Sequence, residues 1–300
     1  MEGRDWDLNP SARLHRQEPP PGSCYLLEPK LVEDFKTFLA IDLRLNCITV
    51  QGHIFQVKRF QRWLIKNRVN EVSRDVLRSY LREYADSSAF TYSNVVKSLR
   101  RLFRDFLGMP DLVGTFRLPK KPLVPKSIPS RSDLQKFYEA LDSKIGKALF
   151  LVYASSGLRK REVLSLKRSD VDFSKRMIVP NCHDGETKHS YLSFFNEETE
   201  KALREYLSAR KDDNAKLFRI GSHPFLDLWK RAYVKAKVRV TPQVLREWFC
   251  SEMVAKGVSD GYVDAFCGRI PRSILARHYL DYSQEKLKTI YDKADLRVLK

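Results

Sequence analysis

Basic side chains dominate the residues of this sequence that could do chemistry. The 300 residues include 55 Lys and Arg against 37 Asp and Glu, a formal net charge of +18 at pH 7. Fixed cations attract polyanions, and duplex DNA has a linear charge density that suits such a surface. The balance excludes an acidic or charge-neutral protein, and double-stranded DNA is the partner that it favours.

Two segments concentrate this charge. Residues 116–131 hold five basic residues, four prolines and no acidic residue, which predicts an extended basic strap. Residues 92–107 have a helical pattern with one apolar face and basic residues at i, i+4 and i+7 on another face. A solvated linker and a charged solvent face would show the same patterns. The predicted DNA-binding residues are Lys97, Arg100, Arg101, Arg104, Lys120, Lys121 and Lys126.

The chemistry available at a phosphate is narrowed by the motifs that the sequence lacks. It has no G-x-x-x-x-G-K-[ST] loop and no H-E-x-x-H pair. Scattered carboxylates could still hold catalytic ions, so a metal-dependent nuclease is demoted but stays open. The remaining route is attack on a phosphodiester by a side-chain nucleophile while fixed cations neutralise the developing charge. Arginine suits that task best, since it is always charged and donates two parallel hydrogen bonds.

A metal site is not expected from the remaining candidates. Cys182, His183 and His189 have no fourth ligand at suitable spacing, and a polar turn explains them better. The five cysteines are odd in number, lie far apart and form no C-x-x-C pair, so we expect reduced thiols. We therefore predict a protein without a metal or another cofactor.

Four segments follow from composition and periodicity. Residues 1–24 are polar and contain a Pro-Pro-Pro-Gly run, which predicts a flexible tail. Residues 25–115 have helical spacing, 116–131 form the basic linker, and 132–300 form a second globular part. No run approaches the ~20 apolar residues of a membrane span, and the first residues lack the order of a signal peptide. We expect a cytoplasmic protein that makes no membrane contact.

The second globular part combines helices with a hairpin. The segments 176–180 and 190–195 read as short strands around a polar turn, and helical periodicity surrounds them. The predicted fold class is mainly α with a small antiparallel β-sheet. Helix starts are predicted at Thr49 and Ser73, and at a capping box formed by Ser132 and Gln135.

Two motifs in the middle of the chain resemble those of the tyrosine recombinase family. The segment SSGLRKREVLSL at 155–166 is similar to the family's first arginine motif and assigns that role to Arg159. Glu162 is expected to support an arginine rather than to catalyse. The segment ETKHSYLS at 186–193 resembles the family's β-hairpin lysine and points to Lys188.

Two later motifs complete the resemblance in the family's order. The segment TPQVLREWF at 241–249 is similar to the His-x-Leu-Arg box and assigns the second arginine to Arg246. The segment GRIPRSILARHY at 268–279 resembles the Gly-His segment that precedes the nucleophile. It places Arg269 at the histidine position and the nucleophile at Tyr279. Tyr282 lies one helical turn further and is the rival nucleophile.

The resemblance implies a fold and an activity. The fold is the two-domain tyrosine recombinase architecture, with a helical core DNA-binding domain at 25–115 and an α+β catalytic domain at 132–300. The closest likeness is to archaeal integrases of the fusellovirus type. The implied activity is site-specific recombination through a 3′-phosphotyrosyl intermediate, without ATP or metal. The implied partners are double-stranded DNA and further copies of the chain, as a tetramer in synapsis, and the implied location is the nucleoid.

Two departures from the family pattern leave alternatives open. Gln243 stands where the family has His, and Arg269 where it has His or Trp. Glutamine donates hydrogen bonds but cannot act as an acid or base, so the activation of Tyr279, with an ordinary pKa of about 10, is not explained. A type IB topoisomerase and a catalytically silent DNA-binding protein are the alternatives.

The C-terminal segment from Ser283 carries an apolar helical face. Family enzymes dock such a helix onto a neighbouring copy. The resemblance therefore predicts that truncation after Tyr282 spares binding to a single site and weakens the assembly of paired sites.

Overall fold

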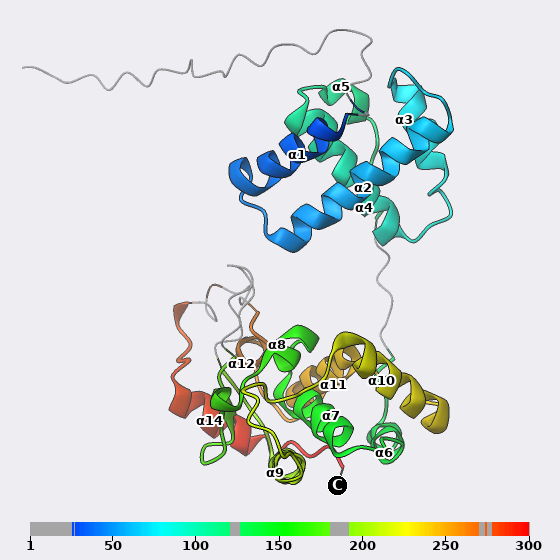
Figure 1. Cartoon of the computed structure of the whole chain (residues 1–300). Coiled ribbons are helices and arrows are strands. Elements are labelled where there is room, and N and C mark those ends of the chain that lie inside the picture. The colour runs from blue at the N-terminus through cyan, green and yellow to red at the C-terminus, as the bar shows by residue number, and fades with distance from the viewer. Residues whose placement is uncertain are drawn as a thin grey trace, which may run out of the picture. The chain divides into compact units, whose positions relative to one another are not determined.

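A computed structural model describes residues 26, 28–120, 127–180, 192–269, 274 and 278–299. The chain divides into two compact units, Met1–Val124 and Pro125–Lys300 (Figure 1). Each unit has its own cluster of buried apolar side chains. The two units are therefore described separately.

The described residues of the N-terminal unit form helices joined by turns and loops, with no strand among them. Its core contains Phe35, Phe60 and Phe103, which are fully buried. The apolar face that the sequence predicts in the last long helix lies in this core, because Val95, Val96 and Leu99 are buried there. The elements are α1 (Pro29–Thr37), η2 (Phe38–Asp42), α2 (Cys47–Lys66), α3 (Arg74–Arg82), α4 (Ala89–Arg100), η3 (Arg101–Phe106) and α5 (Pro110–Val113).

Helix starts in this unit follow capping side chains. Ser73 caps α3 by accepting a hydrogen bond from the backbone N–H of Val76, as predicted. The prediction for α2 was wrong by three residues. Asn46 is its cap, and its side chain accepts from the N–H of Thr49 at 2.9 Å. Asparagine caps a helix at least as well as threonine.

The C-terminal unit contains most of the buried aromatic residues in the described ranges. Its helices are α6 (Arg131–Glu139), α7 (Lys144–Ser156), α8 (Lys160–Ser165), η4 (Arg168–Asp170), α9 (Glu197–Ser208), α10 (Ser222–Ala236), α11 (Pro242–Ala255), α12 (Asp260–Phe266) and α14 (Gln284–Lys293). The capping box of α6 is formed by Ser130 and Asp133, not by Ser132 and Gln135 as the sequence pattern predicted.

The sheet of this unit is small and antiparallel. Strands β1 (Val171–Asp172), β2 (Met177–Ile178) and β3 (Ser193–Phe194) pair in that order, with Met177 opposite Phe194. The predicted strands therefore pair, and β1 is an addition to the prediction. The turn between β2 and β3, residues 181–191, lies outside the described residues. The fold class, mainly α with a small antiparallel sheet, is confirmed.

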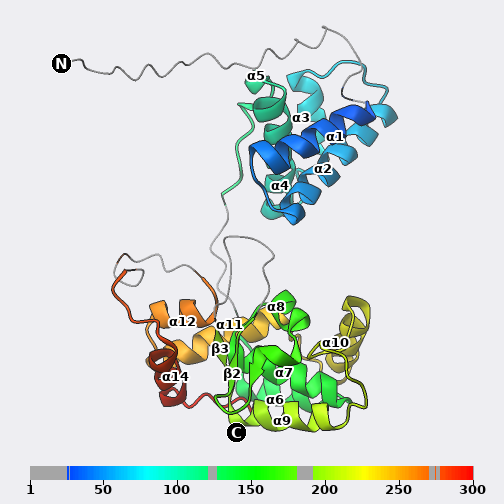
Figure 2. The same ribbon diagram turned by 60° about the vertical axis from the view of Figure 1, so that its left-hand side comes forward.

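Helix α7 is the centre of the C-terminal unit. Every residue from Ala148 to Ser156 is buried. The helix packs on α9 and on α11, and it also contacts α8 and β3 (Figure 2). A helix that is apolar on all sides must be covered by other elements. Residues that follow α7 are consequently held on a rigid base.

The C-terminal segment packs on its own chain. Leu287 and Tyr291 of α14 are buried, and the Tyr291 hydroxyl donates to the backbone oxygen of Ser155 at 2.8 Å. Backbone N–H groups of Val298 and Leu299 donate to the Glu198 carboxylate. In this structure the chain itself buries this face, and the docking of the helix onto a neighbouring copy stays a prediction.

Among the helices in the described ranges, none is both long enough and apolar enough to cross a bilayer.

Candidate active site

A basic cleft of about 690 Å³ opens beside the C-terminal end of α7. It lies between the turn that leads into α8, the exposed side of α10 and the first turn of α11. Its polar lining consists chiefly of cations and one amide. These residues are Arg159, Lys160, Lys230, Arg239, Gln243 and Arg246.

A glycine turn aims the first arginine. Gly157 ends α7 with a left-handed φ of +65°, and a Cβ built there would lie 2.6 Å from the Phe249 ring. Only glycine avoids both the conformational strain and the clash. Two residues later the Arg159 side chain donates to Glu162 at 2.7 Å and to the Gly268 carbonyl at 3.0 Å. Glu162 therefore supports an arginine, as expected.

The second arginine is buried. Arg246, on the first turns of α11, is only 3% exposed. Its two terminal nitrogens donate to the carbonyl oxygens of Gly157 and Cys267, each at 2.6 Å. A guanidinium has five N–H donors, so these two bonds orient the group and leave donors for a further acceptor. The carbonyls come from turns 89 and 21 residues away in sequence.

Arg269 lies on the turn after α12. With Arg159 and Arg246 it forms a group of three arginines, here called the arginine cluster. Its guanidinium is 3.4 Å from the Asp264 carboxylate and 3.7 Å from the Cys250 sulfur. Its backbone N–H donates to the Asp264 carbonyl at 2.8 Å. The side chain is about two-fifths exposed. Asp264 thus aims Arg269 from the C-terminal half of α12.

The electrostatics of the arginine cluster favour the binding of an anion. Burial lowers the pKa of Arg246, and the charges of Arg159 and Arg269 lower it further. The negative charge of Glu162 raises the pKa of Arg246. Three guanidinium groups therefore repel one another in a partly desolvated place. Such repulsion is relieved when an anion enters, and the fixed donors need little reorganisation at that moment.

Gln243 lines the cleft one helical turn before Arg246. Its amide nitrogen donates to Glu247 at 2.9 Å, and the side chain is exposed. At this position the amide can donate a hydrogen bond but cannot exchange a proton. Glutamine in place of the family's histidine therefore keeps a hydrogen-bond donor at this exposed edge of the site and removes an acid–base group.

The two tyrosines differ in their surroundings. Tyr279 is 76% exposed, and within the described ranges no hydrogen bond or ring contact holds it. Tyr282 packs edge-on against Tyr262 at a centroid distance of 5.9 Å, and burial raises its pKa. The structure therefore brings Arg159, Arg246 and Arg269 together and does not bring Tyr279 against them. Lys188 lies outside the described residues.

The predicted DNA-binding helix is partly engaged in local contacts. Lys97 is exposed. Asp105 accepts hydrogen bonds from both Arg101 and Arg104, each at 2.7 Å. Arg100 donates to the Phe116 carbonyl. Lys120 is exposed, whereas Lys121 and Lys126 lie outside the described residues.

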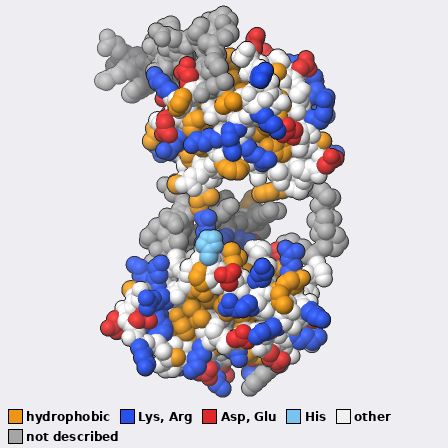
Figure 3. Space-filling model, turned by 45° about the vertical axis from the view of Figure 1, so that its right-hand side comes forward, with side chains coloured by type: hydrophobic (Ala, Val, Ile, Leu, Met, Phe, Trp, Pro, Cys, Tyr) orange, Lys and Arg blue, Asp and Glu red, His pale blue; other side chains and the backbone are white. Residues whose placement is uncertain are grey.

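Sequence reasoning missed the basic residues that α10 and its flanks add to the cleft. Lys230 and Arg239 are exposed on its rim, and the Lys160 ammonium lies 4.6 Å from the centre of the Phe225 ring. The signal that could have found Lys230 is the helical periodicity of residues 222–236. Phe225 and Trp229 face inward there, and Lys230 is exposed. Figure 3 shows basic side chains on the visible face of each unit, interspersed with acidic ones.

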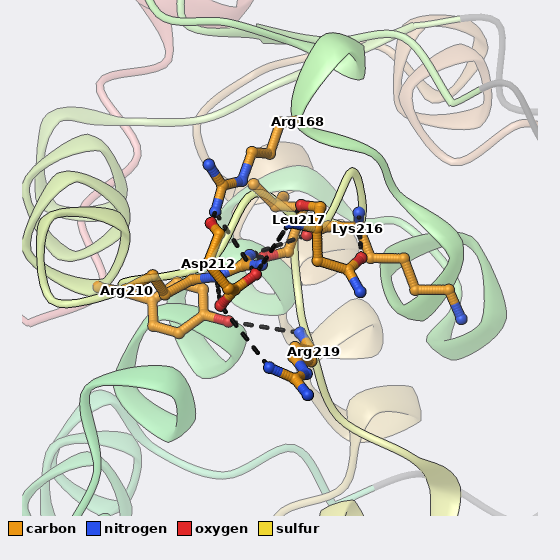
Figure 4. A network of polar contacts seen from close by, with 8 residues as sticks. Arg168, Arg210, Asp212, Lys216, Leu217 and Arg219 are labelled. Carbon is orange, nitrogen blue, oxygen red and sulfur yellow. Dashed lines mark hydrogen bonds and ion pairs between the residues drawn. The ribbon is translucent and has the colours of Figure 1, made fainter.

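A charged network anchors the loop that leads into α10. Arg210 donates to the Asp212 carboxylate, and Arg168 donates to the Asp212 carbonyl at 2.7 Å (Figure 4). Hydrogen bonds from Arg210, helped by nearby cations, lower the pKa of Asp212 to about 2. The Leu217 N–H donates to the Leu166 carbonyl at 2.7 Å. The α9–α10 loop is thereby tied to the end of α8.

No three His, Cys, Asp or Glu side chains within the described ranges gather in a way that could hold a metal ion.

Known proteins resemble the chain over most of its length. A tyrosine recombinase XerA from Thermococcus onnurineus is 27% identical over 89% of this chain and 96% of its own. A lambda integrase dimer bound to a COC′ core site has a TM-score of 0.63 at 14% identity, covering 88% of this chain and 95% of that one. A lambda integrase tetramer bound to a Holliday junction has a TM-score of 0.62 at 16% identity, covering 84% and 76%. At such identities the solved structures show the fold alone, which is that of the two-domain integrases.

The family model described as "Phage integrase family" matches residues 130–286. This range contains all three arginines of the cluster and both candidate tyrosines. The match spans more than half of the sequence, and the family prediction is confirmed: the chain belongs to the phage integrase family.

Proposed function

We propose that this chain is a site-specific DNA recombinase in which the three-arginine cluster binds the scissile phosphate. The observation that carries the proposal is the geometry of Arg246. Its guanidinium is almost fully buried, is held by two backbone carbonyls and feels the charges of two further arginines. Burying a charge is costly for folding. A site that keeps it gains a fixed donor for an anion.

Arg159 and Arg246 hold the non-bridging oxygens of the phosphate. Both are positioned by backbone carbonyls of the turns at Gly157, Cys267 and Gly268. Because these hydrogen bonds orient both guanidinium groups, the donors are in place before charge builds on the phosphate. Arg269 adds a third cation from the turn after α12.

Tyr279 supplies the nucleophile. Its hydroxyl oxygen attacks the phosphorus atom, and the 5′ oxygen of the broken bond leaves with a proton from Lys188. The protein then carries a 3′-phosphotyrosyl bond, and a second 5′ hydroxyl reverses the step. The exposure of Tyr279 supports this role, since a nucleophile that must reach DNA gains from a solvent-facing hydroxyl.

Gln243 stabilises the phosphate by donating from its amide instead of transferring a proton. The field of the arginine cluster favours the phenolate of Tyr279 in place of a histidine base.

The DNA partner and the assembly complete the proposal. The helical unit with Lys97, Arg101 and Arg104 and the linker with Lys120 bind duplex phosphates, and the C-terminal unit carries the chemistry. Exchange of strands needs two duplexes, so we propose an oligomer on DNA, a tetramer in synapsis. The lambda integrase tetramer bound to a Holliday junction supports this as a feature of the fold. A protein of this kind works at the nucleoid.

A nicked suicide substrate tests the function. Cleavage next to the nick releases a short fragment, which traps the covalent adduct for peptide mapping. We expect the adduct on Tyr279 in the unmodified protein and none in Tyr279→Phe, with DNA binding retained because one oxygen is lost. Tyr282→Phe is the matched control, since it removes the same atom three residues away in sequence.

The outcomes separate the alternatives. An adduct mapped to Tyr282 overturns the nucleophile but not the recombinase. No adduct from the unmodified protein on its own site, with or without EDTA, favours a silent DNA-binding protein. Adduct formation with relaxation of supercoils, but without exchange between two marked duplexes, favours a type IB topoisomerase.

A further inference from the structure

Two thiols meet directly behind the arginine cluster. The Sγ atoms of Cys250 and Cys267 are 3.4 Å apart, although the residues are 17 positions apart in sequence. Cys250 lies on α11, one helical turn after Arg246, and Cys267 ends α12. The sequence interpretation treated all five cysteines as separate reduced thiols. The fold brings this pair together.

The two cysteines have different environments. Cys267 is fully buried, whereas Cys250 is half-buried and is reached by the Arg269 guanidinium at 3.7 Å. The hydrogen bond from the Cys267 thiol, with the charges of Arg269 and Arg246, lowers the pKa of Cys250. The same hydrogen bond and burial raise the pKa of Cys267. Cys250 is therefore the thiolate of the pair, and a thiolate is the form that reacts with oxidants.

We propose that Cys250 and Cys267 are a redox modification site, which hydrogen peroxide converts to a disulfide and a thiol reductant restores. The second part of the proposal is that the disulfide stops DNA cleavage. That part rests on the proposed function, whereas formation of the bond does not.

The chemistry balances with one peroxide. The Cys250 thiolate attacks an oxygen of hydrogen peroxide, the O–O bond breaks, and a sulfenic acid and water form once a proton is taken up. The Cys267 sulfur then attacks the Cys250 sulfur, its proton leaves with the hydroxide as a second water, and the S–S bond forms. Two thiols lose two electrons in total, and the peroxide gains both.

The bond must disturb the arginines because of where Cys267 lies. A disulfide holds its sulfur atoms about 2.05 Å apart, so the turn after α12 and the middle of α11 are drawn together from the present 3.4 Å. The Cys267 carbonyl holds Arg246 and the next carbonyl, of Gly268, holds Arg159. A displacement of ~1 Å in a catalytic group can lower a rate by about a hundredfold.

The test uses the full-length protein and two variants. In the first variant, Cys24, Cys47 and Cys182 are replaced by serine, which keeps only the pair. The second variant adds Cys250→Ser. Each protein is treated with hydrogen peroxide, and half of each treated sample is then reduced with dithiothreitol. Proteolysis and mass spectrometry look for a linked peptide that has lost two hydrogens. Adduct formation on the suicide substrate is compared with the same protein kept reduced, and DNA binding is measured in parallel.

We expect the linked Cys250–Cys267 peptide in the unmodified protein and in the pair-only variant. Their adduct yield should fall by about a hundredfold, return after dithiothreitol and leave DNA binding in place. The variant with Cys250→Ser should show neither the peptide nor the loss. Absence of the peptide in folded protein overturns the site. A reversible loss that persists in the Cys250→Ser variant overturns its role in cleavage. Reduced protein that forms no adduct counts against the proposed function instead, and the peptide measurement still stands.

Discussion

Replacing Gly157 by alanine tests how the turn after α7 builds the site. At this position φ is +65°, and an added Cβ would lie 2.6 and 2.7 Å from two atoms of the Phe249 ring and 3.1 Å from the Cys267 sulfur. Gly257 is a matched control, because its φ is +81° and nothing lies within 4 Å of an added Cβ. The two substitutions share the backbone strain and differ in the clash.

The magnitudes follow from those two terms. A left-handed conformation costs an L-residue roughly 1–2 kcal/mol, so Gly257→Ala should lower the free energy of unfolding by about that amount. Gly157→Ala adds overpacking, which typically costs about 1–3 kcal/mol. In a unit of this size each kcal/mol lowers Tm by about 2–4 °C. Gly157→Ala should therefore melt clearly below Gly257→Ala.

Activity separates the variants further. The Gly157 carbonyl accepts from Arg246 at 2.6 Å, and a hydrogen bond to a charged group is worth about 1.5–3 kcal/mol. Displacing that carbonyl should slow adduct formation by about 10- to 100-fold, since each ~1.4 kcal/mol is tenfold. Gly257→Ala should cleave at the rate of the unmodified protein. Calorimetry and single-turnover cleavage below the melting range measure both effects. Equal stability of the two variants, or normal cleavage by Gly157→Ala, would refute the reasoning.

Three further outcomes are expected. Truncation after Tyr282 should unfold the C-terminal unit, because it removes the buried Leu287 and Tyr291, each worth about 1.5–3 kcal/mol; a cooperative, unchanged melting transition in the truncated protein would contradict this. Lys188→Ala should slow cleavage of normal DNA and regain much of the rate with a 5′-phosphorothiolate leaving group, which departs without a proton; equal defects on both substrates would remove Lys188 from the acid role. Burial and two neighbouring cations lower the pKa of His53, so below its ordinary pKa of about 6.5 the unfolded chain takes up the proton first, and the N-terminal unit should lose stability as pH falls. Urea denaturation at several pH values should show a smaller loss of unfolding free energy in His53→Gln than in the unmodified protein. An identical pH dependence in both proteins would contradict this role of His53.

Local patterns predicted much of the fold because they depend on near neighbours. The apolar face of residues 92–107, the cap at Ser73 and the two paired strands all follow from spacing within a few residues. The caps of α2 and α6 were misplaced by two or three residues, since several capping side chains stand close together at each start. Tertiary packing decides among them, because it sets where the apolar face must begin.

The sequence alone determined the family, the net charge and the residue types of the site. Its motifs name Arg159, Arg246 and Arg269 before any coordinate is known. Only the tertiary structure decided what holds them, since carbonyl groups leave no sequence signal and the two that bind Arg246 come from distant turns. The fold likewise decided that Cys250 meets Cys267 and that α14 packs on its own chain. Each of these is a contact between segments far apart in sequence, and such contacts are set by how apolar faces pack rather than by spacing along the chain.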